Sequence, residues 1–147
     1  MQVFGFALYS YLLIMKSFEV RGMATKDIRV IYNKLDEMAY EEFDICDILG
    51  DRELPDFREN WLRLYRELWQ IKYAVKYPEW RDELRKSWRK RSFQKVYKYT
   101  ESMGLASAVA GDMEIMYDGL VLNYEDPWFI EMLETYEQGK IPVGSID

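Results

Sequence analysis

A long amphipathic pattern in the chain is PDFRENWLRLYRELWQIKYAVKY, residues 55–77. Its apolar residues recur at three- and four-residue steps, which is the periodicity of one helix face. They are Phe57, Trp61, Leu64, Leu68, Ile71 and Val75, with Leu62, Tyr65 and Trp69 beside them. Pro55 is favourable in a first helical turn, and Pro78 disfavours helical geometry at the residue before it. The pattern therefore predicts one long helix that is mostly buried.

Two other segments show the same periodicity. Residues 25–49 repeat apolar side chains at helical spacing and predict a single helix that ends at Gly50. The only cysteine, Cys46, falls on the apolar face of this predicted helix, where we expect it to pack as a small hydrophobe. Residues 127–138 predict another helix, because Asp126 is a favourable N-cap residue and a proline follows it.

The sequence predicts that a helix over residues 79–91 ends before Ser92. Trp80, Leu84 and Trp88 share one helix face at four-residue spacing, and we expect them to face the core. The apolar residues that follow them lie on a different face. This change of face predicts a break, with Ser92 as the cap of a new helix.

Residues 113–124 allow two interpretations. Asp118 and Gly119 form a dipeptide that is typical of a two-residue β-hairpin turn. In the other interpretation, Gly111 ends one helix and Asp112 caps the next. We favour the helix, because a lone hairpin among helices would have no sheet to join. The predicted fold is all-α, a single helical bundle of five to seven helices, with a short hairpin near 113–124 as the alternative.

A longer motif lies in the same region of the chain. It consists of VYKYTESMGL at 96–105, followed by Gly111-Asp112 and Tyr117-Asp118. This segment, 96–118, resembles the V-x-x-Y-x-E-S-x-G-L…G-D pattern of a loose group of small bacterial all-helical proteins of unknown function. The resemblance implies a helix rather than a hairpin, and it brings no catalytic residues with it.

Neither a linker nor a repeat divides the sequence, so residues 1–147 are expected to form a single helical domain. The most apolar run, VFGFALYSYLLIM at 3–15, is shorter than the roughly 20 residues that a membrane-spanning helix needs. We therefore expect 3–15 to pack as a core helix and expect no membrane contact. Residues 140–147 are expected to form a C-terminal tail. A single cysteine is typical of a reducing compartment, so the expected location is the cytoplasm.

Charge is segregated along the chain, whose net charge is −6. Residues 72–98 carry ten basic and three acidic side chains, whereas residues 99–147 carry one basic and ten acidic side chains. A basic row of this kind can meet an acidic surface, either on another protein or on a second copy of the chain. The candidate partner-binding residues are Arg81, Arg85, Arg89, Lys90, Arg91 and Lys95.

Two alternative functions remain open at this point. The basic 81–98 segment interleaves cations with aromatic rings, which is the composition of a nucleic-acid-binding surface. The acidic 36–51 cluster suggests a metal-dependent hydrolase, with Glu37, Glu41 and Asp44 as candidate Mg²⁺ ligands on one helix face. A solvated polar face is the favoured interpretation of that cluster, because no recognisable second acidic pair occurs elsewhere.

Composition argues against catalysis and for binding. The chain has no histidine, which removes the commonest general base and the commonest transition-metal ligand, so we expect no cofactor. It is rich in aromatic residues and methionine, with 5 Trp, 12 Tyr, 7 Phe and 8 Met. Such residues are enriched in protein interfaces. The sequence thus predicts a non-catalytic protein-binding or regulatory domain, with nucleic-acid binding and metal-dependent hydrolysis as the alternatives.

Overall fold

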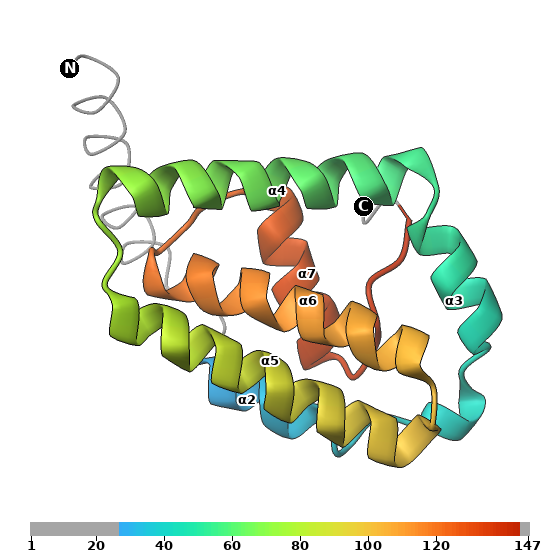
Figure 1. Ribbon diagram of the computed structural model, residues 1–147. Coiled ribbons are helices and arrows are strands. Elements are labelled where there is room, and N and C mark those ends of the chain that lie inside the picture. Colours follow the sequence, from blue (N-terminus) through green and yellow to red (C-terminus); the bar gives the residue numbers. More distant parts are fainter. Residues whose placement is uncertain (1–26, 145–147) are drawn as a thin grey trace.

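The computed structural model describes residues 27–144, and every regular element within that range is a helix (Figure 1). The elements are α2 (Ile28–Lys34), the short 3-10 helix η1 (Tyr40–Glu42), α3 (Ile45–Arg52), α4 (Pro55–Ala74), α5 (Glu79–Thr100), α6 (Met103–Val121) and α7 (Pro127–Glu137). The all-α prediction is confirmed, and the segment 113–124 contains no hairpin. The helix predicted at 3–15 lies outside the described residues. Between residues 27 and 144, no helix is long and apolar enough to cross a bilayer.

Helix α6 lies at the centre of the bundle and contacts each of the other five described α-helices. Figure 1 shows α4 and α5 on opposite sides of it. Twelve of its nineteen residues are buried, which fits a helix that is apolar around most of its circumference. Large side chains that are fully buried come from several helices around it: Ile31, Leu64, Leu68, Phe129, Met132, Leu133 and Tyr136.

Small residues let the neighbouring helices approach α6 closely. At Gly119, an added Cβ atom would overlap the ring of Phe129 from α7. At Gly104, a Cβ atom would lie 2.8 Å from Cδ1 of Leu49 in α3. Both glycines therefore set how near α7 and α3 can lie to the central helix.

The predicted boundaries of α4 and α7 are close to the observed ones. Pro55 is the first residue of α4, which ends at Ala74. Asp126 caps α7 and accepts hydrogen bonds from the backbone N–H groups of Trp128 and Phe129 at 3.0 and 3.1 Å. These ends follow from local chemistry, which the sequence contains.

The single helix predicted for 25–49 is wrong, because the chain turns between α2 and α3. The Tyr40 hydroxyl donates to the backbone oxygen of Leu35 at 2.6 Å and holds this turn. Asp44 then caps α3 by accepting from the backbone N–H of Asp47. Cys46 is exposed, which contradicts its predicted place in an apolar helix face.

Two predicted breaks are also wrong. Helix α5 continues through Ser92, which is fully buried, and α6 continues through Gly111 and Asp112. Trp80 and Leu84 are exposed rather than buried, at 55% and 43%. Of the predicted stripe only Trp88 packs against the core, and α5 buries Ser92 and Val96 in place of Trp80 and Leu84.

The predicted tail has no regular secondary structure over 140–144 but is not free of the bundle. Ile141 is buried in the core, and the backbone oxygen of Pro142 accepts a hydrogen bond from Arg52 Nη1 at 2.9 Å.

Replacing Gly119 with alanine should test the close approach of α6 and α7. The added methyl group would force Phe129 to move, and overpacking of this kind costs about 1–3 kcal/mol of unfolding free energy. Gly50→Ala in α3 is the matched control, because a Cβ atom there meets nothing within 4 Å and alanine favours the helix. Urea denaturation of both variants measures the difference. Equal stabilities for the two variants would contradict the packing described here.

Candidate protein-binding groove

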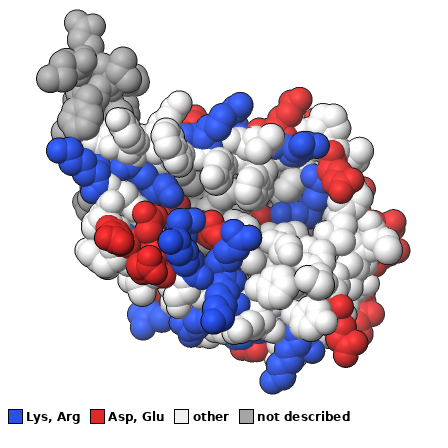
Figure 2. Space-filling model, viewed as in Figure 1, with Lys and Arg blue, Asp and Glu red and all other residues white. Residues whose placement is uncertain are grey.

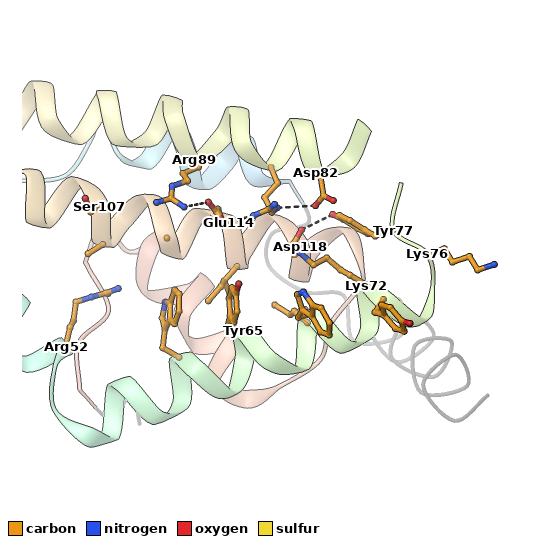
Figure 3. Close-up of a pocket in the computed structure, with 18 residues that line it drawn as sticks. Arg52, Tyr65, Lys72, Lys76, Tyr77, Asp82, Arg89, Ser107, Glu114 and Asp118 are labelled. Carbon is orange, nitrogen blue, oxygen red and sulfur yellow. Dashed lines mark hydrogen bonds and ion pairs between the residues drawn. The ribbon is translucent and has the colours of Figure 1, made fainter. Parts of the chain in front are cut away.

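A groove of about 830 Å³ lies between α4 and α5, with α6 as its floor (Figure 3). The three helices contribute different side chains. Most of the aromatic rings come from α4, two arginines and an aspartate from α5, and mainly small or acidic residues from α6. A second hollow of about 650 Å³ shares Arg52, Trp61 and Ala108 with the groove and extends it toward α3.

The α4 wall is a row of four aromatic residues at four-residue spacing, so they lie on one face of the helix. They are Trp61, Tyr65, Trp69 and Tyr73. Trp61 stacks on Tyr65 with ring centroids 5.9 Å apart, and Trp69 stacks on Tyr73 at 5.8 Å. Three of the rings are strongly exposed, at 50% for Tyr65, 56% for Trp69 and 74% for Tyr73. An exposed aromatic row beside a groove is typical of a protein-binding surface.

The α5 wall carries two arginines that share one carboxylate. Arg85 Nη1 lies 2.6 Å from Oε2 of Glu114, and Arg89 Nη1 lies 2.7 Å from Oε1. The Glu114 side chain is only 14% exposed, and two guanidinium groups balance its charge. The Arg89 side chain remains 58% exposed, so most of its guanidinium surface faces solvent above the groove floor.

A second acidic residue of α6, Asp118, binds both the end of α4 and the segment after it. Lys72 Nζ lies 2.7 Å from Oδ2, and the Tyr77 hydroxyl donates to Oδ1 at 2.9 Å. Burial raises the pKa of Asp118, and the hydrogen bonds from Lys72 and Tyr77 oppose that rise. Burial and the neighbouring Asp118 also raise the pKa of Tyr77, so its hydroxyl stays protonated and remains a donor.

The third acidic residue, Asp112, is fully buried at the other end of the groove. Arg52 of α3 binds it with two hydrogen bonds of 2.7 and 3.0 Å. Trp61 Nε1 donates at 2.9 Å, and the Tyr136 hydroxyl donates at 2.6 Å. Burial raises the pKa of Tyr136 well above its ordinary value, which keeps this donor protonated. The network links α3, α4, α6 and α7 and fixes the ring of Trp61 at the groove wall.

Comparison with known proteins shows to which family the chain belongs. The sequence model of the family described as immunity protein PIM1 matches residues 16–143. The chain belongs to this family. The match includes α2 to α7 and all three walls of the groove, and it also contains the 96–118 segment that resembles small all-helical proteins. No curated protein and no solved structure matches the chain.

In this member of the PIM1 immunity family, only two of the six residues predicted to bind a partner line the groove. They are Arg85 and Arg89. Three of the remaining four contact other residues of the chain. Arg81 lies over the Trp80 ring at 4.2 Å, Arg91 lies over the Trp88 ring at 4.3 Å, and Lys95 binds Asp36 at 2.6 Å. Lys90 is exposed and does not line the groove.

The candidate metal ligands do not share a helix face. Glu37 follows α2 and pairs with Lys34 at 3.1 Å, Glu41 lies in η1, and Asp44 caps α3. Within residues 27–144, no group of three His, Cys, Asp or Glu side chains is arranged to hold a metal ion. The reason is the turn between α2 and α3, which removes the single helix on which the hypothesis depended.

The aromatic wall was not predicted to be a surface. The apolar spacing placed Trp61, Tyr65 and Trp69 in a wide buried stripe, whereas the fully buried positions of α4 are on a different row that includes Leu64 and Leu68. A signal was present for the floor: Asp112 and Asp118 are acidic residues inside a strongly apolar segment, where a carboxylate needs a partner.

Removing the charge of Asp112 should destabilise the fold strongly. Asp112→Asn leaves the Arg52 guanidinium, whose side chain is 9% exposed, without its counter-charge, and breaking such a pair costs about 3–5 kcal/mol. Glu83→Gln is the matched control, because Glu83 pairs with Lys86 at 3.5 Å with both side chains more than 60% exposed. Such a surface pair contributes little. Chemical denaturation measures both, and an Asp112→Asn variant as stable as the control would refute a structural role for the network.

Proposed function

We propose that this chain is a non-catalytic immunity protein that binds a toxin and neutralises it by direct contact. The observation that carries the proposal is the family match over residues 16–143. The groove supports it, because it offers exposed aromatic rings and an exposed arginine on one face. Trp, Tyr and Arg are the residues that most often dominate binding energy at protein interfaces.

The groove also suits tight binding because its walls are already held in place. Trp61 is fixed by its hydrogen bond to Asp112, and Arg85 and Arg89 are fixed by Glu114. Side chains that are ordered before binding lose less conformational entropy when the partner arrives. A protein that covers the working surface of a toxin needs no chemistry of its own, since occupation of that surface is enough.

The partner proposed from the sequence, a protein with an acidic surface, remains compatible with the α5 wall. The nucleic-acid alternative has less support. Of the basic side chains in 81–98, only Arg85 and Arg89 line the groove, so the segment does not present its cations together beside the aromatic row of α4.

Growth rescue tests the proposal. Each toxin domain encoded in the same genome is expressed in a bacterial host with and without the chain, and we expect the chain to restore growth against one of them. The double variant Trp69→Ala/Tyr73→Ala should lose protection and bind that toxin at least about tenfold more weakly, because two exposed groove rings are removed.

Trp80→Ala is the matched control. Trp80 is 55% exposed, close to the 56% of Trp69, but it does not line the groove, so protection should persist. If the wild-type chain protects against none of the toxin domains, the proposed function is wrong. If it protects and the double variant protects equally well, toxin binding does not use the groove.

A further inference from the structure

We infer that the groove receives an acidic segment of the toxin, whose apolar side chains cover the aromatic row of α4 while its carboxylates bind Arg89. This inference rests on the proposed function and adds the chemistry of the partner. Two features on facing walls of the groove support it. The aromatic rings of α4 are exposed, and Arg89 of α5 has N–H donors that make no hydrogen bond within residues 27–144.

The charge of the groove has the opposite sign to that of the whole chain. Its lining contains five basic and three acidic residues, in a chain whose net charge is −6. The three acids are already bound: Asp82 to Arg85, Glu114 to Arg85 and Arg89, and Asp118 to Lys72. Basic side chains gather over α5 on the face shown in Figure 2, beside the uncharged surface near α4. Arg52 is paired with the buried Asp112, which leaves a surplus of one positive charge. An incoming carboxylate therefore meets positive charge that the neighbouring acids have only partly neutralised.

Arg89 is the residue best placed to bind that carboxylate. Its Nη1 binds Glu114, but within residues 27–144 its Nε and Nη2 make no hydrogen bond. Figure 3 shows Arg89 on the α5 side with its guanidinium directed toward Glu114. Glu114 thus holds the guanidinium in position while further N–H donors remain for a partner. A carboxylate beside it would form a charge-assisted hydrogen bond, which is about twice as strong as a neutral one.

The aromatic row sets the length of the segment. Tyr73 lies twelve positions after Trp61, so the row extends about 18 Å along α4 at a rise of 1.5 Å per residue. This equals about three turns of a helix or about five to six residues of extended chain. The segment must carry apolar side chains along that length, because exposed rings gain most from the removal of apolar surface from water.

Single-stranded nucleic acid is the main rival occupant, since its phosphates would also meet Arg89. The family match favours a protein over nucleic acid. Trp61 and Tyr65 are inclined by 8°, and Trp69 and Tyr73 by 12°, and apolar side chains can pack against the exposed edges of these stacked pairs.

Selection from a random 12-residue peptide library displayed on phage, with the full chain as the target, tests the inference without a known toxin. We expect the enriched peptides to combine Asp or Glu with large apolar residues. The best peptide, made with a fluorophore, should bind the Arg89→Gln variant at least about tenfold more weakly than the wild type, and Trp69→Ala should weaken it similarly. Arg89→Lys, which keeps the charge, should restore much of the binding.

Two controls separate the groove from the rest of the surface. Lys86→Gln removes a cation of α5 whose side chain is 62% exposed but which does not line the groove, and Trp80→Ala removes a ring outside it. Both should change the peptide affinity less than about twofold. Arg89→Gln keeps the Arg85–Glu114 pair, so thermal unfolding should show a folded variant.

Several results would overturn the inference. The first is a library that yields no enriched peptide, or enriched peptides without acidic residues. The second is an equal loss of peptide affinity in Arg89→Gln and Lys86→Gln. The third is a 12-nucleotide oligothymidylate that binds the chain more tightly than the best peptide does. Concentration-dependent dimers in sedimentation that Arg89→Gln abolishes would assign the groove to a second copy instead. Growth rescue stays a separate readout: protection by both the wild type and Arg89→Gln would reject the acidic segment and leave the proposed function intact.

Discussion

The structure depends on three carboxylates of one central helix and on the cations that reach them. Helix α6 is surrounded by the five other described α-helices, so Asp112, Glu114 and Asp118 are largely removed from water. A buried carboxylate without a partner would cost several kcal/mol. The partners come from three helices: Arg52 of α3, Lys72 of α4, and Arg85 and Arg89 of α5. These ion pairs therefore join α3, α4 and α5 to the central helix.

The same constraint produces the groove. Lys72 and Trp61 of α4 bind carboxylates of α6, and the arginines of α5 bind another, so polar side chains line the groove beside the buried apolar row of Leu64 and Leu68. Long polar side chains leave the outer row of α4 uncovered, with Trp69 and Tyr73 facing solvent. The ion pairs that stabilise the fold thus also expose the surface with the strongest binding chemistry.

The groove of this member of the PIM1 immunity family is distinct from its core. Core positions such as Phe129 and Leu64 are fully buried, whereas three of the four rings of the α4 row are exposed and only Trp61 packs partly against the core. Arg89 lies at the boundary between the two, because it binds Glu114 while its side chain stays 58% exposed.

Local sequence alone determined the helical class, the start of α4 at Pro55 and the Asp126 cap of α7, because periodicity and capping act over a few residues. The tertiary structure decided the rest. Helix α5 buries Ser92 and Val96 where it packs along α6 instead of breaking there, and its Arg85 and Arg89 bind Glu114, which lies 29 and 25 positions further along the chain. Spacing showed that rings and cations were present, but only the packing around α6 determined which of them line the groove. Contacts between distant residues override local preference when a buried charge must be paired.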